Sequence, residues 1–113
     1  EFMPGPLTLV SEKKEKVPDT LKSDFAFRIS SGEVAPKLAE VGPITATSAN
    51  ISGESTAYSV DDISDELLKK VDYVLNAGKL DKGPTSTIVE FSEEGLVVHR
   101  EGPIKKDEIE KVL

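Results

Sequence analysis

The sequence predicts an α/β fold in which helices pack outside a twisted mixed sheet. Short strand patterns alternate with helix patterns along the chain, which is typical of layered α/β domains. The last two strand patterns are joined by a tight turn and should pair antiparallel, whereas helical crossovers between earlier strands favour parallel neighbours. With 113 residues and 37% hydrophobic content, the chain can bury one small core. We therefore expect residues 1–113 to form a single domain.

The first predicted elements are two strands. An apolar run predicts a strand from Leu7 to Val10, and alternation with a period of two predicts another from Asp24 to Ile29. The segment between them carries a dense basic stretch from Lys13 to Lys16 and a turn at Pro18-Asp19. Because glutamates interrupt and flank this stretch, we interpret it as a solvated loop rather than a binding patch.

A helix should follow the second strand. Ser31 is the candidate N-cap, and Gly42-Pro43 ends the helix. Pro36 lacks an amide proton beyond the expected first turn, so it should kink or shorten the helix. The stripe expected to face the core consists of Val34, Leu38 and Val41.

Small hydroxyl and amide side chains crowd the run from Thr45 to Gly53. The apolar or β-branched residues Val41, Ile44, Thr45 and Thr47 predict a buried strand that leads into Ser48-Ala49-Asn50. At the end of a strand these side chains can form a ligand site, as is usual in α/β proteins, or can simply cap a turn.

The second half of the chain predicts two further helices and three strands. A capping box of Ser59 and Asp62 opens a helix that should run through Val71. The strands are expected over residues 72–76, 85–91 and 96–100, with a hairpin turn at 93–95. The last helix should cover residues 105–113, with Ile109, Val112 and Leu113 facing inward.

Composition limits the classes of function. The net charge is 14 − 21 = −7, which argues against nucleic-acid binding by this chain alone. The sequence has no cysteine and a single histidine, His99, so thiolate and histidine-cluster metal sites are excluded. Neither a leader pattern nor a long apolar run is present, and we expect a cytoplasmic protein with no membrane contact.

Four motifs occur in a fixed order: Pro4-Gly5-Pro6-Leu7-Thr8, Thr47 to Gly53 (T-S-A-N-I-S-G), Gly83 to Glu90 (G-P-T-S-T-I-V-E), and His99 to Gly102. Together they resemble the YrdC-like family of threonylcarbamoyl-AMP synthases. The resemblance implies a twisted mixed sheet that encloses a cleft, with helices outside it.

The resemblance also implies that the chain is the later part of a YrdC-like domain. Family members carry an N-terminal portion with a basic motif before the P-G-P-L-T segment. Glu1-Phe2 could instead be a vector scar before Met3, but we favour Phe2 as the aromatic residue that often precedes the motif. A sheet incomplete at its N-terminal side should expose an apolar edge, unless the chain dimerises or exchanges elements.

Family membership implies a reaction. L-threonine, bicarbonate and ATP give threonylcarbamoyl-AMP and pyrophosphate, with Mg²⁺ accompanying the nucleotide and no organic cofactor. The product serves the t6A modification of tRNA, so RNA and other proteins of that pathway are partners to expect of the parent protein. The parent is expected to be an enzyme, whereas we expect the isolated 113 residues to have little or no synthase activity.

The resemblance assigns binding roles but no catalytic residue. Two departures from the family pattern are Ser30 in place of a proline and Asp24 in place of a small hydroxyl residue, and an acid there would repel phosphate. Without the family, Arg28 would be read as a strand arginine that faces solvent, and the alternative for Arg100 is a surface arginine in a turn. The residues implied are Arg28 and Thr47 for threonine, and Ser48, Asn50, Thr56 and Arg100 for ATP.

Two alternatives remain at this point. One is a carbamoyl-transfer domain of the hydrogenase-maturation type, which shares the motifs and which flanking zinc-finger or acylphosphatase segments would reveal. The other is a non-catalytic module that binds nucleotide or double-stranded RNA, and the acidity argues against its RNA form. A synthase should bind ATP and threonine with positive coupling, whereas an RNA module should ignore threonine.

Overall fold

The computed structural model describes residues 1–15, 17–18, 20 and 24–113, with the side chain of Asp24 left out. The basic stretch at Lys16, the turn at Asp19 and the predicted contact of the Asp24 carboxylate lie outside the described part. The chain divides into two compact units, Glu1–Pro43 with Pro84–Leu113, and Ile44–Gly83.

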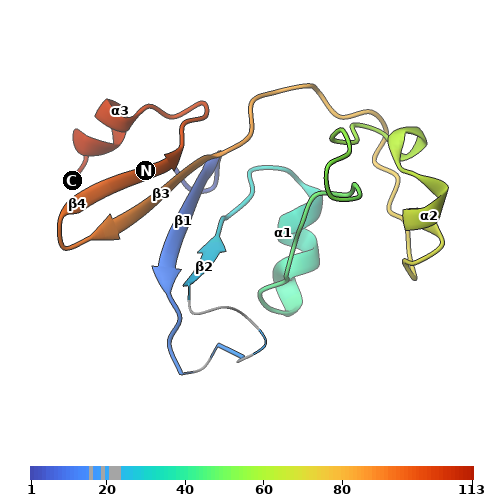
Figure 1. Ribbon diagram of the computed structural model, residues 1–113, viewed down its shortest axis with the longest axis horizontal. Helices are drawn as coiled ribbons and strands as arrows, with labels where there is room; N and C mark the ends of the chain where they lie inside the picture. The colour runs from blue at the N-terminus through green and yellow to red at the C-terminus, as the bar shows by residue number, and fades with distance from the viewer. Residues whose placement is uncertain (16, 19, 21–23) are drawn as a thin grey trace. The chain divides into compact units, whose positions relative to one another are not determined.

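The first unit contains a four-stranded mixed sheet in the order β2-β1-β3-β4, which confirms the predicted α/β class (Figure 1). β1 and β3 are parallel, and the other two neighbouring pairs are antiparallel. The strands are β1 Leu7–Glu12, β2 Asp24–Phe27, β3 Thr87–Ser92 and β4 Gly95–Arg100.

The last two strands form the predicted hairpin. Gly95 begins β4 with a φ of 111°, a backbone conformation that only glycine adopts without strain. Ile88 pairs with Arg100, whereas Val89 pairs with Val98, so His99 is an extra residue in β4. Such a bulge redirects the side chains that follow it, and here the redirected residue is Arg100.

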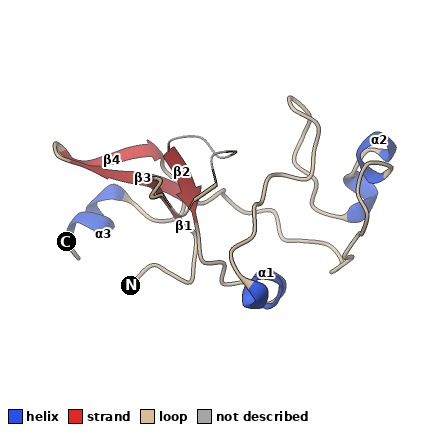
Figure 2. Cartoon of the chain, turned by 90° about the horizontal axis from the view of Figure 1, so that it is seen from below, coloured by secondary structure: helices blue, strands red, loops and turns tan. Residues whose placement is uncertain are grey.

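The core lies between one face of the sheet and the helix α3, Lys106–Glu110 (Figure 2). Among the described residues the buried hydrophobic side chains are Leu7, Val89, Ile104 and Ile109. The prediction that Ile109 faces inward is confirmed. The same prediction was wrong for Val112 and Leu113, which are exposed because the helix ends at Glu110 and the stripe does not continue.

The helix α1, Val34–Leu38, is shorter than predicted and continues as a 3₁₀ turn, η1, over Ala39–Val41. The prediction of Ser31 as N-cap was wrong, since the N-cap is Glu33. Pro36 consequently lies in the first turn, where no intrahelical partner is needed for an amide. The apolar stripe is exposed rather than buried. The predicted end at Gly42, with φ of 135°, is confirmed.

The second unit holds two short helical segments instead of the single predicted helix. These are the 3₁₀ turn η2, Val60–Asp62, and the helix α2, Asp65–Leu68. Ile63 and Ser64 are extended, and Ser64 starts α2 anew by accepting a hydrogen bond from the Leu67 amide. The break explains why the predicted continuation to Val71 is wrong.

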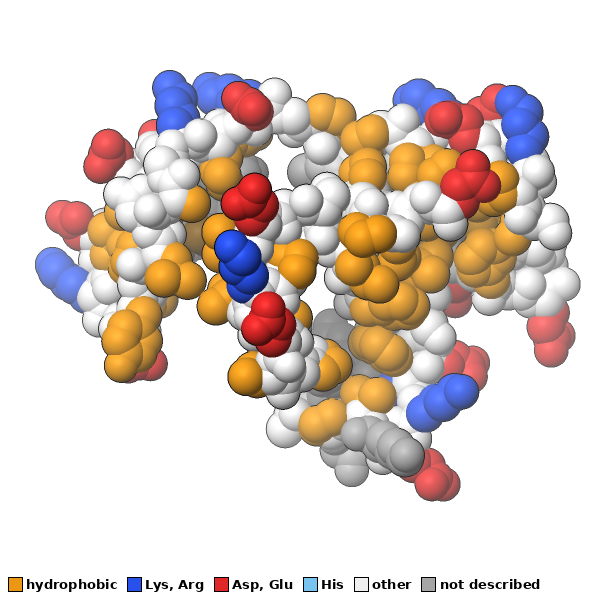
Figure 3. Space-filling model, turned by 180° about the vertical axis from the view of Figure 1, so that it is seen from behind, with side chains coloured by type: hydrophobic (Ala, Val, Ile, Leu, Met, Phe, Trp, Pro, Cys, Tyr) orange, Lys and Arg blue, Asp and Glu red, His pale blue; other side chains and the backbone are white. Residues whose placement is uncertain are grey.

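Two predicted strands of the second unit, around residues 44–47 and over residues 72–76, do not form. An isolated extended segment has no partner for its backbone groups, so sequence preference alone does not make a strand. Ile44 is 47% exposed, Leu75 is 66% exposed and Tyr73 is 90% exposed. Exposed hydrophobic side chains are visible in Figure 3. The prediction of a buried strand before Ser48 is therefore wrong for this chain.

None of the helices in the described part of the chain is long and apolar enough to cross a membrane.

Candidate functional site

Both predicted site arginines lie at the same end of the sheet. β1 and β3 start at this end, because Leu7 pairs with Thr87 in parallel register. The antiparallel neighbours β2 and β4 finish there, so Arg28 directly follows β2 and Arg100 closes β4. Three interstrand intervals of about 4.8 Å put the edge strands roughly 14 Å apart. Two separated cations at one end of a sheet suit a ligand with two anionic groups.

Arg100 is held in place by Ser86. Its Nε donates to the Ser86 carbonyl oxygen at 3.0 Å, and one terminal nitrogen donates to the Ser86 hydroxyl at 3.2 Å. The guanidinium has further N–H donors, and none of the described residues accepts a hydrogen bond from them. Arg100 is thus an anchored cation with one edge available to an anion.

Two hydroxyl groups extend the polar surface beside Arg100. The side chains of Thr8 and Ser86 are hydrogen-bonded at 2.8 Å, although the residues are 78 positions apart in the chain. Thr8 alternates with the buried Leu7 along β1, so it faces away from α3. Sequence reasoning assigned no role to Thr8. For Ser86 and Thr87 it suggested local hydrogen bonds that shape the cleft wall, or a contact with phosphate. The sequence contains the signal, since Thr8 ends the P-G-P-L-T motif.

Arg28 lies beyond the end of β2, because the strand stops two residues earlier than predicted. It is exposed, and none of the described residues forms an ion pair with it. The next residue, Ile29, accepts a hydrogen bond from the Gly5 amide at 2.9 Å. This bond ties the segment that carries Arg28 to the first sequence motif.

His99 has a partner that sequence reasoning missed. Its Nε2 lies 2.7 Å from Oε2 of Glu90 on the neighbouring strand. Both side chains are partly exposed, so the contact contributes little to stability. The pair lies on β3 and β4 near Arg100, and its geometry gives no sign of a catalytic base.

In the second unit, Asn50 shapes a turn. Its side-chain amide donates to the carbonyl oxygens of Ile51 and Glu54 at 3.0 and 3.1 Å. Gly53, with φ of 89°, allows the chain to fold back. The buried Oδ1 of Asn50 has no hydrogen-bond partner among the described residues. Exchanging the amide oxygen and nitrogen would set the single amide oxygen against two carbonyl oxygens, so the orientation is fixed and the buried acceptor remains unsatisfied.

Thr47 and Ser48 are exposed. Neither side chain makes a hydrogen bond to any described residue. Their hydroxyl groups therefore remain available to solvent or to a ligand. Threonine binding by Thr47 and ATP binding by Ser48 stay predictions.

Thr56 lies in a polar hollow of about 470 Å³, open to solvent. Its other lining residues, which sequence reasoning missed, are Ser55, Tyr58, Asp62 and Lys82. The amides of Tyr58 and Ser59 both donate to Oδ2 of Asp62 at 3.0 Å, and these bonds lower the pKa of that carboxyl. The Lys82 ammonium lies 5.4 Å from the centre of the Tyr58 ring. The hollow thus combines hydroxyl groups with one cation beside an engaged carboxylate.

The described residues contain no group of three or more His, Cys, Asp or Glu that could hold a metal ion. A magnesium ion usually keeps several waters and binds substrate phosphates through few protein ligands. The side chains present therefore provide no protein cage for Mg²⁺.

Comparisons with known proteins agree with the motifs. A family model for Sua5, YciO and YrdC, described as "Telomere recombination", matches residues 1–102. The threonylcarbamoyl-AMP synthase of Pyrococcus abyssi is 37% identical in an alignment of 117 positions, which covers 99% of this chain and 34% of that protein. A relative from Methanocaldococcus jannaschii, whose name gives that activity provisionally, is 42% identical over 109 residues, 94% of this chain and 52% of that protein.

Solved structures of Pyrococcus abyssi Sua5 have the same fold. A doubly substituted variant matches 99% of this chain with a TM-score of 0.86, and a complex with L-threonine matches it with a TM-score of 0.85. Both are 37% identical, and the chain covers 36% and 34% of them. The chain spans about a third to a half of the length of these relatives. The sheet topology, the motif order and these matches together show that the chain belongs to the Sua5/YciO/YrdC family.

Proposed function

We propose that the chain supplies part of the substrate-binding surface of a threonylcarbamoyl-AMP synthase. The reaction joins L-threonine, bicarbonate and ATP. It yields threonylcarbamoyl-AMP and pyrophosphate, with water released to balance the atoms. Such a reaction needs side chains for orientation and charge neutralisation more than for covalent chemistry.

Arg100 carries the proposal. Its guanidinium is fixed on Ser86 through one edge, and its remaining donors have no acceptor among the described residues and can bind an anion. A fixed guanidinium binds phosphate oxygens without first losing side-chain entropy. We assign Arg100 to the ATP phosphates for this reason.

The other assignments rest on family membership and on side-chain chemistry. Arg28 would bind the threonine carboxylate, with Thr47 as a further threonine contact. Ser48, Asn50 and Thr56 would contact ATP, and the unsatisfied Oδ1 of Asn50 supports a ligand or partner donor there. Mg²⁺ would be carried by the nucleotide phosphates, where it neutralises negative charge.

The setting of the reaction is also proposed. Residues 1–113 would form the later part of a YrdC-like domain, and the basic motif of the parent protein would complete the phosphate site. The product would serve t6A modification of tRNA in the cytoplasm, so that RNA and other proteins of the pathway would be partners of the parent. A dimer would be one way to cover exposed apolar surface.

Calorimetry on the full-length protein tests the proposal. ATP should bind more tightly in the presence of L-threonine, and threonine should gain the same factor from ATP, because binding coupling is reciprocal. Arg100→Lys keeps the charge but loses the two-pronged geometry, and it should weaken ATP binding about tenfold or more. Lys106→Ala removes an exposed positive charge from α3 and serves as the matched control, with ATP affinity unchanged within about twofold.

Two results would contradict the proposal. Full-length protein that binds ATP without any influence of threonine would favour a nucleotide-binding module. Pyrophosphate release that requires carbamoyl phosphate in place of threonine and bicarbonate would favour the carbamoyl-transfer alternative.

A further inference from the structure

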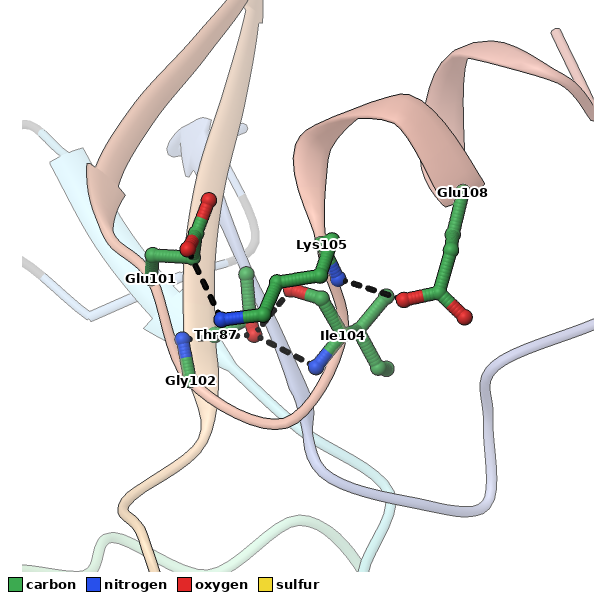
Figure 4. A network of polar contacts seen from close by, with 6 residues as sticks. All are labelled: Thr87, Glu101, Gly102, Ile104, Lys105 and Glu108. Atoms are coloured by element: carbon green, nitrogen blue, oxygen red, sulfur yellow. Dashed lines mark hydrogen bonds and ion pairs between the residues drawn. The ribbon is translucent and has the colours of Figure 1, made fainter.

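Thr87 makes a set of buried hydrogen bonds that the proposed function does not use. The residue is fully buried at the start of β3. Its hydroxyl donates to the Ile104 carbonyl oxygen at 2.7 Å and accepts from the amides of Gly102 and Ile104 at 3.0 and 3.1 Å (Figure 4). One donor and two acceptor positions are all that a threonine hydroxyl offers, so its capacity is used completely.

These bonds fasten the segment between β4 and α3 to the start of β3. Gly102 lies so close to β3 that an added Cβ would collide with the Thr85 carbonyl oxygen and would meet the Thr87 amide nitrogen at 2.7 Å. The close approach needs glycine, and the hydroxyl of Thr87 satisfies the amides that this approach buries.

The Ile104 side chain also packs in the hydrophobic core, whereas the other polar contacts of the segment are on its exposed side. Lys105 Nζ pairs with Oε1 of Glu101 at 2.8 Å, and the Lys105 amide donates to Oε2 of Glu108 at 2.8 Å. Exposed pairs of this kind add little. The buried Thr87 hydroxyl is therefore the main polar tie that holds the segment in place.

Ser86, just before β3, and Thr87, its first residue, thus hold neighbouring parts of the chain. Ser86 binds the Arg100 guanidinium. The Thr87 hydroxyl binds the backbone of Gly102 and Ile104, two and four residues after Arg100. Arg100 follows the extra residue of the bulge, so its side chain is redirected although its backbone pairs with Ile88. A restraint just beyond Arg100 would add to this pairing and keep the guanidinium on Ser86.

We infer that Thr87 is a positioning residue, whose buried hydroxyl holds the segment from Gly102 to Ile104 and thereby keeps Arg100 oriented for an anionic ligand. The inference rests on the proposed function only for the identity of that ligand, the phosphates of ATP. The Thr87 side chain itself is fully buried.

The test compares Thr87→Val, which removes the hydroxyl and keeps the shape, with Thr87→Ser, which keeps the hydroxyl. In full-length protein labelled with ¹⁵N, the heteronuclear NOE of Arg100 Nε should fall in the valine variant and remain near wild type in the serine variant. Amide exchange at Gly102 and Ile104 should accelerate about tenfold or more in the valine variant. Its ATP affinity should fall about tenfold, with recovery in the serine variant.

Each outcome decides the inference. An ordered Arg100 Nε in a folded Thr87→Val protein overturns it, whatever happens to ATP binding. A mobile Arg100 with unchanged ATP affinity upholds the positioning role and refutes the assignment of Arg100 to ATP. If Thr87→Val does not fold, Gly102→Ala displaces the same segment with the hydroxyl intact. In that variant Arg100 Nε must become mobile, and an ordered Arg100 there overturns the inference.

Discussion

Ile109 should contribute more to stability than any other side chain of α3. It is 2% exposed and packs with Leu7, Val89 and Ile104, the other buried hydrophobic residues of the described chain. Ile109→Ala removes three carbon atoms, worth about 2.4 kcal/mol at about 0.8 kcal/mol each. A residual cavity adds to this loss, so we expect the free energy of unfolding to fall by about 2 to 5 kcal/mol.

Urea denaturation followed by circular dichroism measures the change, provided that the m-values of variant and wild type agree. Val112→Ala is the matched control, because Val112 lies beyond the end of α3 and is 47% exposed. The control should cost less than about 1 kcal/mol. Equal losses of unfolding free energy in the two variants would refute the conclusion that Ile109 packs in the core and Val112 does not.

Three further predictions concern turns and charges. Gly95→Ala should cost about 1 to 3 kcal/mol in the same assay, because its φ of 111° strains an L-residue although its Cβ would meet nothing within 4 Å. In an NMR titration, the chemical shift of the Tyr58 amide should follow the ionisation of the Asp62 carboxyl, with a midpoint below the ordinary carboxyl pKa. Asp62→Asn should abolish that transition. Glu101 raises the pKa of Lys105, so Glu101→Gln should lower that pKa in an alkaline NMR titration.

The direction of each pH effect follows from the sign of the pKa shift. The lowered pKa of Asp62 gives stability that is present above its unfolded pKa and is lost as the pH falls through its folded pKa. The raised pKa of Lys105 gives stability that is present below its unfolded pKa and is lost as the pH rises through its folded pKa. Asp61→Asn is the control for the Asp62 transition seen at the Tyr58 amide, and Glu110→Gln is the control for the Lys105 titration. A control variant that altered its transition would contradict these assignments.

The sequence predicted the sheet of the first unit well, because its strands find partners within the chain. The alternation of Phe25 and Phe27 and the hairpin signal before Leu96 both correspond to strands that pair in the sheet. Boundaries were less accurate. The end of the last helix depended on whether Val112 continues a turn, and helix ends carry weak sequence signals.

The second unit shows where sequence patterns fail. Ile44 and Val74 lie in segments with strand preference, yet neither segment has a strand partner in the described chain. Preference for extended backbone becomes a strand only when another strand supplies the hydrogen bonds. Similarly, the capping box that predicted one helix through Val71 could not reveal that Ile63 and Ser64 are extended.

Site residues were predictable by type but not by contact. The sequence singled out Asn50 as a polar residue at a strand end, but only the structure shows that its amide closes the turn to Glu54. The sequence also could not show that Ser86 anchors Arg100, since the two residues meet through tertiary pairing of β3 and β4.

Two of the four sequence motifs contact each other in the structure. The motif from Gly83 to Glu90 supplies Ser86 and Thr87, and the motif from His99 to Gly102 supplies the groups that these residues bind. Gly102 must be a glycine because β3 lies against it, and Thr87 must carry a hydroxyl because the approach buries two amides. A change in either motif therefore disturbs the other, which gives a physical reason for both to occur together in a chain that orients an arginine at this end of the sheet.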